Sequence, residues 1–181
     1  KLHAPAKINL WLDVGPVLAN GRHPLASLVV FADEAASDLL QIEPADAVSL
    51  NIIGPFASGL LAEPVEANLV WRAAMALLER TGCRRGAGIT LDKRLPLASG
   101  MGGGSADAAA ALDGLNRFWS LGLNTSELMA IAAELGADVP ACLIGEAGWM
   151  SGTGETFERL EGVCAFPSVL CNPGKPCPTG P

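Results

Sequence analysis

The chain has 181 residues, of which half are hydrophobic and 17% are charged, so its composition indicates a folded globular protein and excludes a disordered chain. The formal net charge of −7 argues against a nucleic-acid partner, because phosphate contacts need clustered Lys and Arg side chains. The longest apolar runs are too short for a membrane span, so no membrane partner is expected. The one basic cluster is interpreted as a solvated rim and consists of Arg84, Arg85, Lys93 and Arg94.

The first third of the chain carries three strand signals. Residues 7–14 alternate in polarity, which predicts a half-buried strand whose apolar face consists of Ile8, Leu10, Leu12 and Val14. The same alternation places Lys7 and Asn9 side by side on the opposite face. Residues 25–33 and 48–53 are predicted as the second and third strands, and a turn is expected at Asn20-Gly21 between the first two strands.

Helices with clear boundaries follow in the middle of the chain. Asn68 is predicted to cap a helix that ends at Gly82, and a short strand is expected at 88–91. Further helices are predicted at 105–119 and 125–135, the latter opened by a capping pair of Asn124 and Glu127. A hairpin around 151–154 and an edge strand at 164–171 complete the prediction. Without a regular βαβ repeat, the pattern favours an α+β domain with a mixed sheet.

Five cysteines are present, and no two have the C-x-x-C spacing of a zinc or redox site. Reduced thiols in a cytoplasmic protein are therefore expected, and a disulfide between Cys171 and Cys177 is judged improbable. A change of domain is expected near Glu161-Gly162, and the proline-rich end of the chain suggests that a further domain is cut or missing beyond Pro181.

A glycine-rich loop directly precedes the predicted helix at 105–119. Glycine lets a ligand approach the backbone, and a helix N-terminus offers unpaired N–H groups and partial positive charge, so together they form an anion cradle. We therefore expect a phosphate group here, with the Ser105 hydroxyl as a candidate ligand for phosphate or Mg²⁺. The predicted nucleotide-binding residues are Pro96, Leu97, Ala98, Ser99, Gly100, Met101, Gly102, Gly103, Gly104, Ser105 and Ala106.

Other types of glycine-rich loop fit this stretch less well. A Walker A loop would need Lys after its last glycine, and none follows Gly104. A dinucleotide-binding G-x-G-x-x-G motif starting at Gly100 would need glycine where Ser105 stands. A flexible linker is the remaining alternative, but linkers seldom lie between a strand signal and a strong helix signal.

The segment PLASGMGGGSADAA resembles the second motif of the galactokinase, homoserine kinase, mevalonate kinase and phosphomevalonate kinase (GHMP) superfamily. Two further segments, APAKINLWL and LGADVPACL, resemble those of one family within it, the kinases that act on 4-diphosphocytidyl-2-C-methyl-D-erythritol. The segments NGRHPLASLVVFAD and NPGKPCPT are similar to that family as well. The resemblance covers nearly the whole chain in order.

The resemblance implies an α+β, mixed-sheet GHMP-kinase N-terminal domain, like domain 2 of ribosomal protein S5, at residues 1–161. Residues 162–181 would then be the start of a truncated or missing C-terminal α/β domain. The implied activity is ATP- and Mg²⁺-dependent phosphorylation of the 2-hydroxyl of a small cytidyl diphosphate substrate in non-mevalonate isoprenoid synthesis. Two alternatives stay open, namely another GHMP kinase acting on homoserine or a mevalonate-like alcohol, and a nucleotide-binding module without catalysis. A homodimer is a candidate assembly.

The resemblance also assigns roles to individual residues. Asp138 matches the catalytic aspartate and Lys7 its lysine partner. From the residues alone, Asp138 could equally be a turn or cap residue, and Lys7 could be an edge lysine that extends into solvent. Asn9 is expected to orient the substrate or Lys7, while Arg22 and His23 match the cytidine-contacting positions, with Arg22 standing where the family usually has Tyr.

Overall fold

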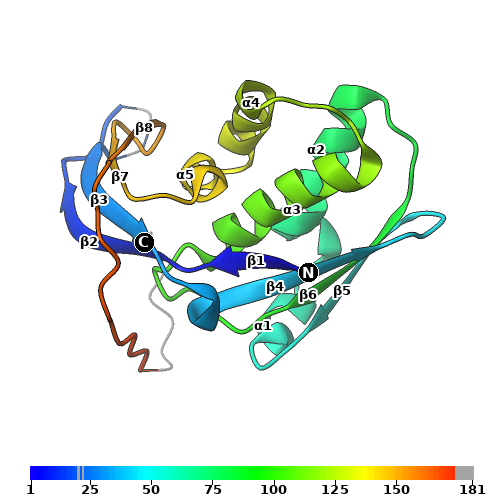
Figure 1. Cartoon of the computed structure of the whole chain (residues 1–181), viewed down its shortest axis with the longest axis horizontal. Helices are drawn as coiled ribbons and strands as arrows, with labels where there is room; N and C mark the ends of the chain where they lie inside the picture. Colours follow the sequence, from blue (N-terminus) through cyan, green and yellow to red (C-terminus); the bar gives the residue numbers. More distant parts are fainter. Residues whose placement is uncertain (20, 22, 174–181) are drawn as a thin grey trace.

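The computed structural model describes residues 1–19, 21 and 23–173, which form two four-stranded sheets and five α-helices (Figure 1). The strands are β1 (Leu2–Pro5), β2 (Lys7–Val14), β3 (Leu25–Phe31), β4 (Ser37–Glu43), β5 (Val48–Ile53), β6 (Ala87–Asp92), β7 (Gly148–Ser151) and β8 (Thr156–Arg159). The helices are α1 (Ala57–Leu61), α2 (Leu69–Thr81), α3 (Gly103–Trp119), α4 (Thr125–Leu135) and α5 (Val139–Ile144), with 3₁₀ turns η1 (Glu34–Ala36) and η2 (Val65–Ala67). None of the helices in this described part is both long and apolar enough to cross a membrane.

The two sheets have different topologies. The first has the order β1-β4-β6-β5 and is mixed, because β5 pairs parallel with β6 while its other pairs are antiparallel. The second has the order β2-β3-β7-β8 and is antiparallel throughout. The predicted α+β class with a mixed sheet is therefore confirmed, although the predicted strands are divided between two sheets.

The main hydrophobic core lies between the first sheet and helices α2, α3 and α4 (Figure 1). The helix boundaries follow the predicted caps. The Asn68 side chain accepts a hydrogen bond from Val70 N, and Gly82 ends α2 in the left-handed conformation. Asn124 and Glu127 form a complete capping box at the start of α4, so the local signals in the sequence were sufficient to define these helices.

The chain passes from the first sheet to the second at Ala6, between β1 and β2. Ala6 donates a hydrogen bond to Ala36 O at 3.0 Å and accepts one from Ala32 N at 2.9 Å, so it is tied to the return connection between β3 and β4. Lys7 is the next residue and therefore stands where the two sheets meet. This crossing, which the alternation of residues 7–14 could not indicate, places Lys7 near the glycine loop.

The predicted side-chain alternation of residues 7–14 is only partly correct. The pairing of β2 with β3 shifts between Asn9 and Trp11, a β-bulge that leaves Leu10 without a partner in the register. Beyond the bulge, Leu12 points to the same side as Lys7 and Asn9, because the extra residue reverses the alternation. The expected apolar face is also largely exposed, and both Leu10 and Leu12 are more than two-fifths exposed.

The predicted strand at 164–171 is wrong, since residues 160–173 contain no helix or strand. Pro167 lacks an N–H for a strand ladder, and Val169 is 87% exposed, so little burial rewards strand formation there. Strands β1 and β4 and the short helix α5 were not predicted. Cysteines 83, 142, 164 and 171 are free thiols, whereas Cys177 lies outside the described residues.

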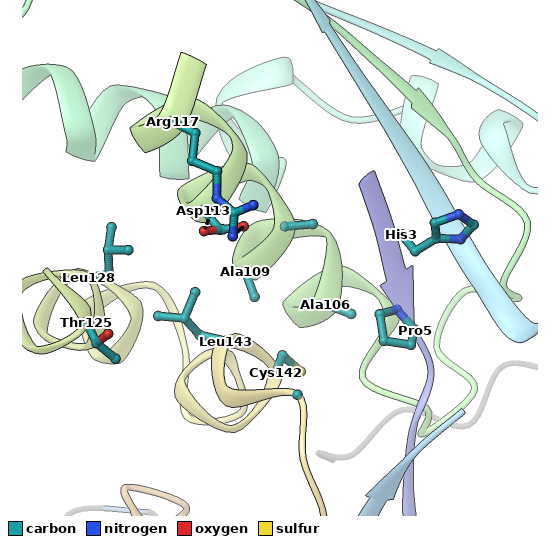
Figure 2. Close-up of a pocket in the computed structure, with 12 residues that line it drawn as sticks. His3, Pro5, Ala106, Ala109, Asp113, Arg117, Thr125, Leu128, Cys142 and Leu143 are labelled. Carbon is teal, nitrogen blue, oxygen red and sulfur yellow. Dashed lines mark hydrogen bonds and ion pairs between the residues drawn. The ribbon is translucent and has the colours of Figure 1, made fainter. Parts of the chain in front are cut away.

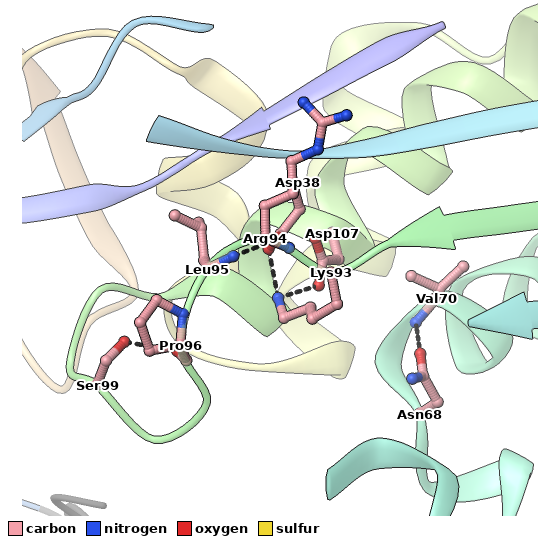
Figure 3. Close-up of polar contacts among 9 residues, drawn as sticks. All are labelled: Asp38, Asn68, Val70, Lys93, Arg94, Leu95, Pro96, Ser99 and Asp107. Carbon is pink, nitrogen blue, oxygen red and sulfur yellow. Dashed lines mark hydrogen bonds and ion pairs between the residues drawn. The ribbon is translucent and has the colours of Figure 1, made fainter. Parts of the chain in front are cut away.

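A buried ionic cluster joins the first sheet to the start of α3 (Figure 3). Lys93 Nζ donates to Asp38 Oδ2 and, at 2.6 Å, to Asp107 Oδ2, and all three side chains are at most 2% exposed. The interpretation of Lys93 as a solvated rim residue is therefore wrong. Lys93 continues the inward face of β6, where Ala87, Ile89 and Leu91 are buried at every second position.

Asp107 is the carboxylate that α3 contributes to this cluster. It points into the ionic cluster, its Oδ1 atom is buried, and that atom has no hydrogen-bond partner within the described structure. Burial raises the pKa of Asp107 from 3.8 to about 7, and the neighbouring positive charge of Lys93 offsets only part of this rise. The burial of this side chain and its unpaired oxygen therefore both disfavour the ionised carboxylate, while Lys93 favours it.

This raised pKa predicts a specific pH dependence of folding stability. Between about pH 4 and pH 7 the folded chain holds a proton on Asp107 that the unfolded chain has released. This contribution is complete below about pH 4 and is lost as the pH rises to about 7, with a slope of at most about 1.4 kcal/mol per pH unit. Asp107→Asn, which cannot titrate, should remove this slope from urea-unfolding free energies measured between pH 4 and pH 8.

The control for this measurement is Asp113→Asn on the same helix. Asp113 forms a solvent-exposed pair with Arg117 and should leave the slope unchanged. Equal slopes for the parent and Asp107→Asn would show that Asp107 titrates at its ordinary pKa.

Candidate active site

The glycine loop runs from the end of β6 to the first residue of α3. Three residues of this loop have positive φ angles, namely Gly100 at 75°, Gly102 at 61° and Ala98 at 47°. Ala98 is the one non-glycine residue among them. The helical hydrogen-bond ladder begins with Ala106 N donating to Gly102 O at 2.9 Å. The amides of residues 103–105 therefore precede the ladder, as the predicted anion cradle requires.

The end of the loop is fastened to β2. Lys7 N donates to Met101 O at 2.9 Å, which joins the strand to the loop through their backbones. A Cβ atom on Gly102 would lie 3.3 Å from the Lys7 side chain, so this position needs glycine for its close approach as well as for its positive φ. The predicted phosphate loop and the predicted catalytic lysine are thus direct neighbours.

Lys7, Asn9 and Asp138 come together at this junction. Lys7 Nζ donates to Asn9 Oδ1 at 2.8 Å and lies 3.6 Å from Asp138 Oδ1. The Lys7 side chain is 3% exposed, whereas that of Asp138 is 37% exposed. Lys7 is therefore not an edge lysine that extends into solvent, and its buried ammonium faces a carboxylate that a ligand can reach.

The local backbone explains how Asp138 is presented. It occupies the N-cap position of α5, but its side chain makes no capping hydrogen bond and is free to face Lys7. The side chain of Asp138 therefore does not cap α5, and the alternative role as a helix cap is wrong. Pro140 lies in the first turn of α5, where its missing N–H costs no helical hydrogen bond.

Cys142 lies on α5, one turn after Asp138, and sequence reasoning gave it no role. Burial raises the pKa of its thiol to about 12, and the nearby negative charge of Asp138 raises it further. A thiol with this pKa stays protonated at neutral pH. The site therefore offers a lysine–aspartate pair and not a cysteine nucleophile.

His23, one of the two residues predicted to contact the nucleoside, lies at the other end of β2. His23 is exposed, and its Nδ1 atom lies 2.9 Å from Gly15 O in the connection between β2 and β3. Lys7 pairs with Phe31 and Val14 with Leu25, so His23 and Lys7 stand at opposite ends of the hairpin. Arg22 lies outside the described residues.

A separate hollow of about 320 Å³ is bordered by α3, α4, α5 and β1 (Figure 2). Ala106 lines it, and it is the only one of the predicted site residues to do so in the described structure. The hollow therefore does not coincide with the junction of Lys7 and Asp138. Cys142 lines the hollow and lies one helical turn after Asp138, so the two places adjoin along α5.

Gly103 has an environment that sequence reasoning did not predict. A Cβ atom there would lie 3.0 Å from Lys93 Nζ and 3.5 Å from Asp38 Oδ2, so its missing side chain points into the ionic cluster. We therefore expect Gly103→Val to destabilise the fold by about 1–3 kcal/mol through overpacking, as measured by urea unfolding.

Gly104→Ala is the matched control for that prediction. Its Cβ atom would make only an ordinary 3.7 Å contact with Leu69, at an exposed position in a helix. It should fold at least as stably as the parent, because alanine favours helices more than glycine. If Gly103→Val and Gly104→Ala had equal free energies of unfolding, the ionic cluster would be able to rearrange around a side chain at position 103, and the prediction would be wrong.

Comparison with known proteins connects this site to a family. Residues 68–146 match the model of the GHMP kinases N terminal domain. A 4-diphosphocytidyl-2-C-methyl-D-erythritol kinase of Hyphomonas neptunium is 48% identical over 178 residues, which are 98% of this chain and 58% of the relative. A kinase of the same name from Rhodospirillum rubrum is 47% identical over 97% of this chain and 57% of the relative. The chain thus spans a little over half the length of these curated relatives.

Solved structures agree with these matches. A crystal structure of 4-(cytidine 5'-diphospho)-2C-methyl-D-erythritol kinase superposes with a TM-score of 0.70 and 37% identity, covering 87% of this chain and 54% of that one. A homoserine kinase from Cytophaga hutchinsonii shares the fold at a TM-score of 0.60 and 21% identity, covering 87% of this chain and 52% of that one. Taken with the glycine loop and its neighbours, these matches show that the chain belongs to the GHMP kinase family.

Proposed function

We propose that this chain transfers the γ-phosphoryl group of ATP to the 2-hydroxyl of 4-diphosphocytidyl-2-C-methyl-D-erythritol. The observation that carries the proposal is the contact between three parts of the site. Lys7 bonds the end of the glycine loop through its backbone and faces Asp138 through its side chain. A phosphate on the loop and a hydroxyl at Asp138 would therefore both adjoin Lys7. The names of the relatives support this choice of substrate.

Asp138 would accept the proton of the attacking hydroxyl. Its carboxylate is half-buried and lies 3.6 Å from the ammonium group of Lys7, so a hydroxyl bound there would meet a proton acceptor beside a positive charge. Lys7 is held on its other side by Asn9, so its charge has a fixed position. The same charge would steady the negative phosphoryl oxygens during transfer, and the site would need to reorganise little as the reaction proceeds.

The glycine loop and the start of α3 would hold the ATP phosphates together with Mg²⁺. The fit rests on exposed Gly104, open space beside Gly100, and amides that precede the helical ladder. Ser105 is partly exposed in the first turn of α3 and could offer its hydroxyl to phosphate or to the cation. When bound, Mg²⁺ neutralises charge on the phosphate oxygens. We propose residues 1–161 as the domain that contains this site.

An elongated substrate would suit the geometry of β2. The strand spans roughly 20 Å at about 3.3 Å per residue, from Lys7 at the reacting end to the His23 loop at the other. Leu12 and Val14 lie on the same side as Lys7 and Asn9 and are about half exposed. A cytidyl diphosphate substrate could therefore place its alcohol at Asp138 and its base near His23, which Arg22 precedes in the sequence.

The substrate assignment predicts the outcome of a panel of alcohols assayed with ATP and Mg²⁺. ADP release should be much faster with the cytidylated methylerythritol than with homoserine or mevalonate, because only the first can reach both ends of β2. Faster turnover of homoserine or mevalonate would identify a different GHMP kinase. ATP binding without turnover of any alcohol would instead favour a nucleotide-binding module.

The proton acceptor can be tested by changing Asp138 and Lys7. Asp138→Asn keeps the shape of the side chain and removes its basicity, so kcat should fall by about 10²- to 10⁴-fold while the Kd of ATP stays near the parental value. Lys7→Met should also lower kcat, and the loss in the double variant should be smaller than the product of the two single losses.

His23→Ala is the control, because His23 lies at the far end of β2 from the reacting group. It should raise KM for the cytidyl substrate more than it lowers kcat. Near-parental kcat in Asp138→Asn would exclude Asp138 as the proton acceptor.

A further inference from the structure

We propose that the ionic cluster of Asp38, Lys93 and Asp107 is the positioning network of the glycine loop. In this network Asp107 acts through Lys93 to hold the start of α3 in place for the nucleotide phosphates. The inference rests on the proposed function, since it concerns the site proposed for ATP. It assigns a role in nucleotide binding to three side chains that are buried and touch no bound ligand themselves.

Asp38 fixes the first residues of the loop. Its Oδ1 atom accepts hydrogen bonds from Arg94 N at 2.6 Å and from Leu95 N at 2.7 Å, directly after β6 ends (Figure 3). Its Oδ2 atom accepts from Lys93 Nζ. The backbone of the loop is therefore bound to β4 at the point where the chain leaves the sheet.

Lys93 extends this attachment to the helix. Its Nζ atom donates to Asp107 Oδ2 at 2.6 Å, and Asp107 lies just beyond the first turn of α3. The ammonium group also lies 3.0 Å from the position that a Cβ atom of Gly103 would occupy. The network is thus in contact with the first residue of the helix, whereas the next residue, Gly104, is exposed.

The far end of the loop is attached separately by the backbone bond between Lys7 N and Met101 O. Between the two attachments, Ala98 and Gly100 are exposed and have positive φ angles. The glycine loop is therefore attached at both ends and exposed in its middle, so its backbone shape is set before a ligand binds. Preorganisation of this kind lowers the cost of binding, because less backbone has to be ordered.

The stability of the fold does not by itself explain why three charged side chains are buried together. Burying ions costs several kcal/mol each, and well-packed apolar residues often replace buried ion pairs with no loss of stability. Hydrogen bonds between ions differ from apolar contacts in that they fix direction as well as distance. We infer that the cluster is needed for the geometry of the loop.

The test compares stability with ATP affinity in variants of the cluster. In Asp107→Ala, Lys93 loses its link to α3, and the Kd of ATP measured by calorimetry should rise about 10- to 100-fold. Asp107→Asn can still accept a hydrogen bond from Lys93 and should stay within about threefold of the parent, which is the rescue that a positioning role requires. Asp113→Ala removes a partly exposed carboxylate of α3 that pairs with Arg117 outside the cluster, and it should bind ATP as the parent does.

A second variant separates positioning from folding. The triple change Asp38→Asn, Lys93→Met and Asp107→Leu removes all three buried charges together. The amide oxygen of Asn can still accept the two backbone N–H groups that Asp38 holds, so the variant should fold with a Tm near that of the parent. Its Kd for ATP should nevertheless rise as in Asp107→Ala, with the Kd of the cytidyl substrate unchanged. All titrations are made well below the lowest Tm.

The outcomes distinguish the two levels of the proposal. Parental ATP affinity in the triple variant, or in a folded Asp107→Ala, would overturn the positioning role and leave the proposed kinase function intact. Failure of the parent itself to bind ATP would overturn the phosphate-loop assignment, and the positioning role would be overturned with it.

Discussion

The arrangement of the site depends on the hydrogen bonds of one residue, Lys7. Its backbone amide bonds Met101 at the end of the glycine loop, and its side chain bonds Asn9 and faces Asp138. These partners come from a loop, from the same strand and from a short helix, so no other described residue joins as many parts of the site. Lys7 can do this because the chain changes sheets at Ala6, one residue earlier.

The structure holds two buried lysines in different settings. Lys93 donates to two buried carboxylates and is closed off from any ligand by Gly103 and α3. Lys7 has a neutral amide on one side and a partly exposed carboxylate on the other. A buried ammonium with one accessible partner can act on a bound phosphate, whereas one with two buried partners can only hold its surroundings in place. The two environments therefore suit a reactive and a positioning role.

The family assignment and the geometry support each other at different levels. The relatives identify a kinase fold and suggest a cytidylated substrate, but the chain spans only a little over half of their length. The geometry adds what names cannot provide, namely a glycine loop whose last amides precede the helical ladder, a lysine–aspartate pair beside it, and a long strand leading away from that pair. The combination supports phosphoryl transfer to an elongated alcohol.

The sequence by itself determined the elements that local contacts define. The caps at Asn68, Gly82 and Asn124, the bounds of the strand at 7–14 and the glycine loop before a helix were all visible, because hydrogen bonds and alternation within a few residues specify them. The family motifs likewise brought Lys7 and Asp138 together before the structure placed them 3.6 Å apart.

Only the tertiary structure decided the burial of Lys93, the direction of Gly103 and the face on which Leu12 lies. Lys93 meets Asp38 across a separation of 55 residues, and nothing near either residue in the sequence indicates its partner. The bulge after Asn9 likewise depends on how β2 pairs with β3. Periodicity describes one segment at a time, whereas a buried charge or a strand register is fixed by contacts between segments.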